Sequence, residues 1–270
     1  MSEKPVARSP EHQETADADK VDLALEALVA EDVRTAEDLL LEVMRNCPER
    51  YAYRTEVDGG LVIKFWDQRE FFHYVTFGKA RGEEKAVRWM KSAYPRAFYY
   101  LGFLKTKLGD PEQALAFLDA GLALEPTNAK LVCEKAQALI SLKRHEEALA
   151  LYRTLKEPGP HVSAHDVAMG LRGQGSILVD LGDLHRAREA FERSLEIEPG
   201  SEVALGELDY IAHLLRGGKP FEGSVTTVTP SPKLECASCG KPLSGSGKIA
   251  NVDGRTVALC QACDEPKKPR

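Results

Sequence analysis

The sequence has no long apolar run and no basic leader followed by an apolar stretch. A membrane-spanning helix needs roughly 18 uninterrupted apolar residues, and no segment approaches that length. The first residues, MSEKPVARSPEHQE, are mostly polar and do not have the layout of a secretion signal. We therefore expect a cytoplasmic protein without an association with a membrane.

Positive charge is also in deficit. The chain has 36 Lys and Arg against 42 Asp and Glu, which gives a net charge of -6. Because this balance provides no general attraction for phosphates, nucleic-acid binding would need a local basic site. Nucleic acid is therefore not the expected partner.

Motifs of catalysis are missing as well. The sequence contains no Gly-rich phosphate loop, no nucleophile elbow and no pair of carboxylates in a catalytic pattern, and its seven histidines are scattered. We expect that the protein is not an enzyme.

Cysteine is scarce, but four of the six cysteines form two CxxC pairs near the end of the sequence. These four are Cys236, Cys239, Cys260 and Cys263. Such spacing is typical of a metal site and not of the disulfide framework of a secreted protein. Cys47 and Cys133 stand alone in helical patterns, where a free cysteine usually serves as a small buried apolar residue.

The two pairs predict a structural zinc site. Twenty residues separate them in CASCGKPLSGSGKIANVDGRTVALCQAC, and four thiolates can surround a Zn²⁺ ion at about 2.3 Å. Four cysteine ligands leave no coordination position for water, which argues against catalytic zinc. KIANVDGRTVAL predicts a hairpin that turns at Asp253-Gly254. Residues 234–266 resemble a zinc ribbon, a module so small that its folding depends on the metal. A redox-active dithiol is the alternative.

An internal repeat runs through the preceding part of the chain. A small residue, an alanine twelve positions later and a proline twelve positions after that recur four times. The triplets are Ala24/Ala36/Pro48, Gly102/Ala114/Pro126, Ala136/Ala148/Pro160 and Gly175/Ala187/Pro199. The second and third triplets are 34 residues apart and the next interval is 39. This indicates a 34-residue period with extra residues near 159–167.

Small residues at this spacing allow two antiparallel helices to pack closely. We expect Gly102 to face Ala114, and Gly175 to face Ala187. The Leu-Gly-Asp turns at 108–110 and 181–183 supply a glycine for a left-handed helix end and an aspartate that can begin the next helix.

Two segments carry a resemblance to a known family. YYLGFLKTKLGDPEQALAFLDAGLALEPTN and GSILVDLGDLHRAREAFERSLEIEPG resemble the tetratricopeptide repeat. The resemblance covers residues 95–215, with three units and a capping helix near Glu202 to Leu215, and extends more weakly to residues 17–50. It implies a mainly α fold, an α-solenoid whose concave groove binds extended peptides or helices.

Residues 51–94 interrupt the period, and fourteen of the nineteen aromatic residues lie between Tyr51 and Phe103. The alternation of apolar and polar residues around Asp58-Gly59-Gly60 predicts a β-hairpin. A helix from about Gln68 to Tyr74 is expected after it. We therefore expect a small α+β insertion. Its aromatic side chains suit either a recognition surface or a small core that seals the hairpin against the solenoid. Consecutive pairs such as Phe65-Trp66 cannot all point inwards.

The repeat register places candidate partner-binding residues on the first helix of each unit. These are Arg96, Tyr99, Phe103, Lys107, Lys130, Gln137, Arg172 and Ser176. Their mixture of aromatic and basic groups suits an acidic or amphipathic peptide. Chaperone-binding members of the family hold a C-terminal carboxylate with Lys, Asn and Arg side chains in this groove. The residues at those positions here are Tyr99, Phe103, Glu134 and Gly173, so we expect no capture of chaperone tails.

The sequence therefore predicts seven consecutive segments. They are a disordered tail (1–16), a first helix pair (17–50), the insertion (51–94), three repeat units with a capping helix (95–215), a linker (216–233), the zinc ribbon (234–266) and a short tail (267–270). The expected function is a protein-interaction scaffold that binds a partner peptide or helix in the groove, with the structural zinc module as a second docking element. The alternative is a regulatory factor that contacts nucleic acid or the transcription machinery through the zinc ribbon.

Overall fold

The computed structural model describes residues 10–82, 85–219, 248–252 and 255–259. The chain divides into one unit of residues 1–217 and a second unit of residues 218–270. Among the helices that the structure describes, none is a candidate for a membrane span. The four cysteines of the predicted zinc site lie outside the described residues.

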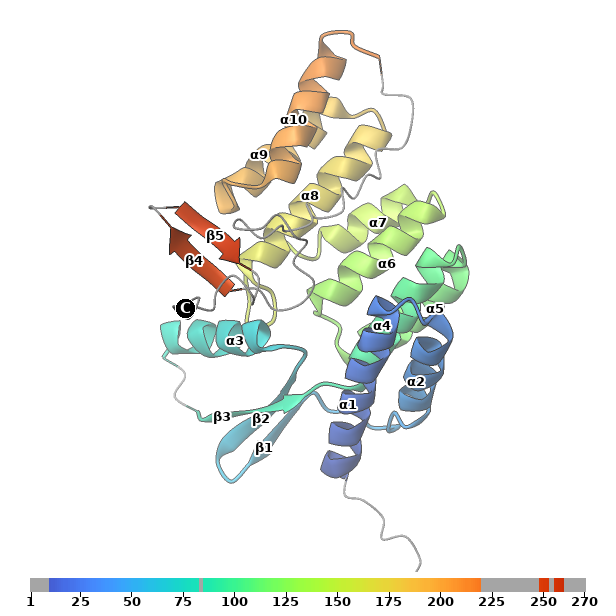
Figure 1. Ribbon diagram of the computed structural model, residues 1–270. Helices are drawn as coiled ribbons and strands as arrows, with labels where there is room; N and C mark the ends of the chain where they lie inside the picture. Colours follow the sequence, from blue (N-terminus) through green and yellow to red (C-terminus); the bar gives the residue numbers. More distant parts are fainter. Residues whose placement is uncertain (1–9, 83–84, 220–247, 253–254, 260–270) are drawn as a thin grey trace, which may run out of the picture. The chain divides into compact units, whose positions relative to one another are not determined.

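The described part of the first unit contains ten helices and a small sheet (Figure 1). The helices are α1 (Pro10–Val29), α2 (Val33–Arg45), α3 (Gln68–Ala80), α4 (Tyr94–Lys107), α5 (Pro111–Leu124), α6 (Ala129–Ser141), α7 (His145–Tyr152), α8 (Ala164–Asp180), α9 (Leu184–Ile197) and α10 (Glu202–Leu215). The pairs α4–α5, α6–α7 and α8–α9 stack on one another, α10 packs on α9, and α2 packs on α4. This confirms the predicted helical-repeat architecture.

The Leu-Gly-Asp turns have the predicted geometry. Gly109 and Gly182 have left-handed φ values of 80° and 77°, a conformation that glycine adopts without steric cost. The side chain of Asp110 accepts a hydrogen bond from the backbone N of Gln113 at 3.0 Å, so it caps α5. Asp183 caps α9 in the same way. Each turn therefore ends one helix and begins its antiparallel partner.

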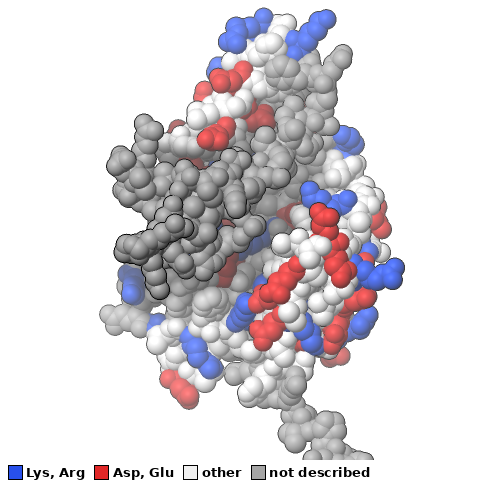
Figure 2. All heavy atoms as spheres, viewed as in Figure 1, with Lys and Arg blue, Asp and Glu red and all other residues white. Residues whose placement is uncertain are grey.

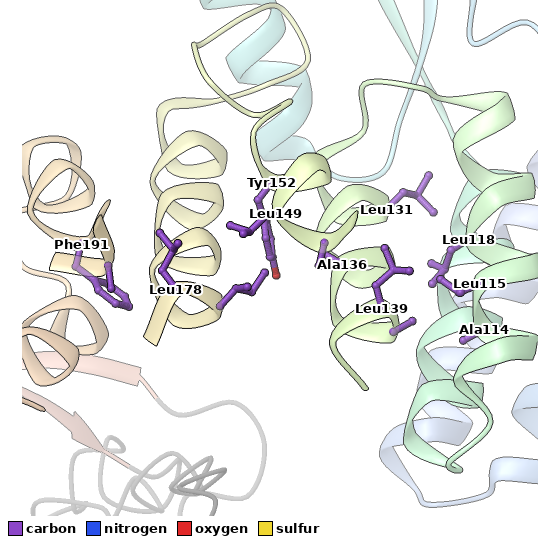
Figure 3. Packing of buried hydrophobic residues seen from close by; sticks show 14 of the residues in the cluster. Ala114, Leu115, Leu118, Leu131, Ala136, Leu139, Leu149, Tyr152, Leu178 and Phe191 are labelled. Carbon is purple, nitrogen blue, oxygen red and sulfur yellow. The ribbon is translucent and has the colours of Figure 1, made fainter. Parts of the chain in front are cut away.

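Glycine also sets how closely the paired helices approach. A Cβ atom built on Gly102 would lie 2.5 Å from Leu118 Cγ, and one on Gly175 would lie 2.6 Å from Phe191 Cε2. The nearest side chains opposite these glycines are thus Leu118 and Phe191, and not the predicted alanines. Both are fully buried, in a core that runs without interruption from one helix pair to the next (Figure 3).

The insertion forms a three-stranded sheet covered by one helix. Strands β1 (Arg54–Val57) and β2 (Gly60–Phe65) form the predicted hairpin, with Thr55 opposite Val62. Strand β3 (Val87–Lys91) was not predicted; it runs parallel to β2. Helix α3 continues to Ala80, beyond the predicted end, because its face packs on the sheet through a small core. That core contains Leu61, Ile63, Phe65, Phe71, Tyr74 and Val87.

The prediction of disorder up to residue 16 is wrong for residues 10–16, because α1 begins at Pro10. Glu14 is buried, with Oε2 2.7 Å from Lys64 Nζ of the sheet. Asp17 is fully buried and accepts a hydrogen bond from Asn46 Nδ2 at 2.9 Å. Glu14, which lies in the tail predicted to be disordered, is therefore ordered by a partner 50 positions away, and Asp17 holds the following turn of the same helix.

In the second unit, the structure describes strands β4 (Lys248–Val252) and β5 (Arg255–Leu259). They pair in antiparallel register, with Asn251 opposite Thr256. This confirms the hairpin predicted between the two CxxC pairs.

The close approach at Gly175 leads to a stability prediction. Gly175→Val should lower the free energy of unfolding by about 2 kcal/mol, because the added side chain overlaps the buried ring of Phe191. Gly206→Val is the matched control, since a Cβ atom at Gly206 of α10 would have no neighbour within 4 Å. Its effect should stay within about 0.5 kcal/mol. Urea unfolding followed by far-UV circular dichroism measures both, and equal losses would contradict the role of the helix crossing.

Candidate functional site

The insertion is joined to the repeats through Trp66. The indole is 6% exposed and belongs to the core of the repeats. Its Nε1 donates a hydrogen bond to Glu125 Oε2 at 2.9 Å. The ring lies edge-on to Tyr99, with 5.3 Å between the centroids. Because Tyr99 is one of the predicted groove residues, the insertion itself occupies this part of the groove.

Lys130, another predicted groove residue, is also engaged by the insertion. Its Nζ forms an ion pair with Glu70, in the first turn of α3, and lies 3.3 Å from Oδ2 of Asp67, the residue that caps this helix. The same Nζ lies 5.2 Å from the centroid of the Trp66 ring, within range of a cation–π interaction. The charge of Lys130 is therefore balanced within the chain.

Arg96 is not a groove residue, contrary to the prediction. It is 4% exposed, and its Nη2 donates to Asp22 Oδ1 of α1 at 2.6 Å. A second guanidinium nitrogen donates to the backbone O of Ser92 at 3.2 Å. Helix α1 of the first helix pair thus covers Arg96. The residues at the equivalent position of the later repeat units, Lys130 and Met169, line the groove.

Four predicted groove residues stay accessible along the helices. Phe103 is half-buried, with Lys107 Nζ 5.5 Å from its ring centroid. Gln137 is exposed and donates from Nε2 to the hydroxyl of Tyr152 at 3.0 Å. Ser176 is exposed on α8. Whether these side chains contact a partner stays a prediction.

Arg172 is held by a residue at the end of α9. Its Nη1 lies 2.6 Å from Glu198 Oε2, and His165 Nδ1 lies 2.5 Å from the other oxygen of the same carboxylate. Glu198 therefore fixes Arg172 and the first turn of α8 together.

A second junction joins the insertion to the loop before α8. His73 Nε2 donates a hydrogen bond to the backbone O of Gly159 at 2.7 Å. The ring of His161 packs on Tyr53 and Tyr74, with centroid distances of 5.4 and 5.1 Å. Burial lowers the pKa of His161 to about 4, so this imidazole is neutral at physiological pH.

Between these two junctions lies a cleft of about 430 Å³. The insertion lines one side, the turn between α5 and α6 the second, and the start of α8 the third. The lining includes Tyr53, Phe65, Arg69 and His73 from the insertion, residues 125–130 from the turn, and Pro160, His161 and Met169 from the last segment. Lys130 and Met169 occupy the positions of their repeat units that are equivalent to Arg96 in the preceding unit. The cleft is therefore the beginning of the groove, walled by the insertion.

The cleft as such was not predicted from the sequence. His161 was not considered as a site residue, and Arg96 was wrongly predicted to face the groove. The sequence contained one sign of the cleft. The insertion and the extra residues near 159–167 are the two departures from the 34-residue period, and these two segments contact each other.

Glu125 connects the cleft with the junction at Trp66. Its Oε2 accepts from Trp66 and, at 2.8 Å, from Asn128 Nδ2, while Oε1 lies 3.3 Å from the hydroxyls of Tyr51 and Ser92. Burial raises the pKa of this carboxyl from 4.5 to about 7, since desolvation disfavours the charged form. The junction thus contains a group that titrates near neutral pH.

Comparison with known proteins identifies the repeats. Tetratricopeptide-repeat profiles match residues 105–168 and 173–201, so these segments are tetratricopeptide repeats, which cover α5 to α9 and the end of α4. No curated protein sequence matches this chain.

Three solved structures illustrate what the chain is similar to. PilF of Pseudomonas aeruginosa is 14% identical, over 76% of this chain and 72% of PilF, with a TM-score of 0.54. MamA is 15% identical, over 76% and 84% of the two chains, with a TM-score of 0.47. The second repeat domain of human RPAP3, solved in complex with an HSP70 peptide, is 26% identical over 43% of this chain and 92% of that domain, with a TM-score of 0.38. Of these three, PilF supports a shared fold, and its low identity carries no further conclusion.

The raised pKa of Glu125 predicts a dependence of stability on pH. The folded protein holds this proton at pH values where the unfolded chain has released it, so the stability that the group contributes is complete below about pH 4.5 and is lost as the pH rises through 7. Glu125→Gln keeps a neutral acceptor for Trp66 and removes this loss. The variant should gain stability over the parent between about pH 5 and 8, on the order of 3 kcal/mol at the upper end.

Thermal unfolding across this pH range measures the gain. Glu26→Gln, at an exposed position of α1, is the control and should leave the pH profile unchanged. A constant difference between the Glu125 variant and the parent at all pH values would contradict a buried titrating carboxyl.

Proposed function

We propose that the protein is an interaction scaffold that binds a segment of a partner protein in the cleft between the insertion and the first turns of α6 and α8. The observation that carries this proposal is the cleft itself, which lies at the start of the repeat groove and is walled on one side by the insertion. Apolar atoms form most of the exposed wall of the cleft, and many of the residues that line it also carry a polar group, so the cleft can offer both kinds of contact to a bound segment.

The lining supports a peptide as the bound group. Tyr53 and Met169 offer apolar contact area, and the exposed Arg69 has no ion-pair partner among the described residues. The carboxylate of Asp166 is already used in the capping box of α8, where the backbone N of Ser163 donates to it at 2.7 Å. An extended segment that leaves the cleft along α6 and α8 would meet Gln137 and Ser176. We place its polar contacts there.

A binding selection tests this proposal. Peptides selected from a random display library against the full chain should bind at least tenfold more weakly to Met169→Arg, because a charged side chain would fill the floor of the cleft. Leu205→Arg, at an exposed position of α10 that does not line the cleft, should bind as the parent does. Isothermal titration calorimetry gives the affinities. Peptides whose affinity is unchanged by Met169→Arg would show that the cleft is not their site.

We further propose that the four cysteines hold one structural zinc ion in the second unit. The donor set fits zinc, since two CxxC pairs provide four thiolates. The hairpin β4–β5 lies between the pairs, and Cys260 follows directly after the last residue of β5, Leu259. In this proposal the zinc module is the second docking element of the scaffold.

Metal analysis tests the zinc site. The full chain should contain one zinc ion per molecule, and Cys236→Ser or Cys260→Ser should lose it, because three thiolates bind the ion far less tightly. Cys133→Ser is the matched control; burial raises the pKa of that thiol to about 12, so it is a poor ligand. Chelation should leave the helical circular dichroism of the repeats unchanged. A metal-free chain with disulfides inside the CxxC pairs would instead support the redox alternative.

A further inference from the structure

The outward face of α3 carries basic and aromatic side chains but no acid. The exposed residues of this helix are Gln68, Arg69, Phe72, Thr76, Lys79 and Ala80. Phe72 is 55% exposed, in the middle of this face. The one acid of α3, Glu70, is turned away, since it pairs with Lys130 and accepts a hydrogen bond from the backbone N of Trp66 at 2.8 Å. The face is thus a cationic surface around an aromatic ring.

The exposed aromatic area extends from α3 to the edge of the sheet. Phe72 contacts Phe71, with centroids 5.7 Å apart, and Phe71 stacks on Trp89 of β3 at 5.8 Å and an interplanar angle of 14°. Trp89 is 38% exposed, and its Nε1 donates to the backbone O of Phe65 at 3.3 Å. These rings are held by their mutual contacts and by the hydrogen bond of Trp89, so they lose little conformational entropy when a partner covers them. Rigid aromatic side chains of this kind dominate the energetics of protein interfaces.

The charge of the insertion is opposite to that of the remainder of the chain. Residues 51–94 contain eight Lys and Arg and six Asp and Glu, whereas the remaining residues contain 28 and 36. Figure 2 shows acidic side chains concentrated over α1, α2 and their neighbours, and several basic side chains over the insertion. An acidic partner is therefore attracted to the insertion and repelled by the surface beside it.

We propose that the surface formed by Arg69, Phe72, Thr76 and Lys79 binds an acidic amphipathic helix of a partner protein. Arg69 and Lys79 are ten positions apart, which is about 15 Å along the helix axis. Carboxylates about three turns apart on a partner helix reach both cations, and an apolar side chain between them packs on Phe72. Two cations offer few phosphate contacts, which favours a protein over a nucleic acid. Arg69 also lines the cleft, whereas Phe72, Thr76 and Lys79 do not, so this surface adjoins the cleft and extends beyond it.

A defined probe tests the surface. The probe is a fluorescein-labelled peptide of about 18 residues with Glu on one helical face and Leu on the other. Fluorescence anisotropy with the full chain should show binding that is about tenfold weaker for Phe72→Ser and about fivefold weaker for Lys79→Glu. The Lys79→Glu effect should be smaller at higher salt, because salt screens exposed charges. The matched controls, Leu205→Ser and Arg193→Glu, alter exposed residues of α10 and α9 and should bind as the parent does.

Three outcomes overturn the proposal. The first is equal binding of a scrambled peptide of the same composition. The second concerns a labelled single-stranded oligonucleotide. If Phe72→Ser and Lys79→Glu weaken the binding of the oligonucleotide but not that of the acidic peptide, the surface binds nucleic acid. The third is a peptide that is weakened only by Met169→Arg, which would place it in the cleft and leave α3 without a partner. The variants of Phe72 and Lys79 thus test the proposal for α3, and Met169→Arg separately tests the proposal for the cleft.

Discussion

The burial of Trp66 in the repeats is the contact on which the cleft depends. Without it, residues 51–94 would be held to the solenoid by their ends, by the ion pairs to α1 and to Lys130, and by the second junction at His73 and His161. The indole lies in the core of the repeats, donates to Glu125 and covers Tyr99. Breaking this contact would leave a buried carboxyl without one of its donors, which costs more than the hydrogen bond itself contributes. The position of the cleft wall is therefore set by a hydrogen bond and an aromatic contact, and not by the repeat geometry alone.

The junction at Trp66 also explains why some groove positions are not available. In a regular solenoid, each first helix exposes the same register positions on the concave side. Here α1 covers Arg96 through Asp22, and the insertion covers Tyr99 and Lys130. The accessible part of the groove accordingly comprises the end of α4, at Phe103 and Lys107, and the faces of α6 and α8 that carry Gln137 and Ser176. A repeat protein can thus restrict its binding surface by adding an insertion, without a change in the helices that line the groove.

Features that depend on neighbouring residues could be predicted from the sequence, and features that depend on distant contacts could not. The glycine and aspartate of each Leu-Gly-Asp turn act within a few residues, as does the turn of the hairpin, where Asp58 and Gly59 both have positive φ. Strand β3 needs β2 as a parallel partner, and its sequence VRWMK has no clear alternation. The start of α1 depends on Lys64 and Asn46. The error at Arg96 has the same origin, because its partner lies 74 positions away.

Contacts between non-adjacent elements change how such a solenoid should unfold. In a simple repeat protein each unit contacts its neighbours only, so the ends can separate from the stack one unit at a time. The insertion precedes α4, yet His73 donates to Gly159 and Tyr53 packs on His161 in the loop before α8. These contacts close a loop around the α4–α5 and α6–α7 pairs. Neither pair can then open without breaking the junction, so the segment from the insertion to α8 is coupled into one cooperative unit and the cleft keeps its shape.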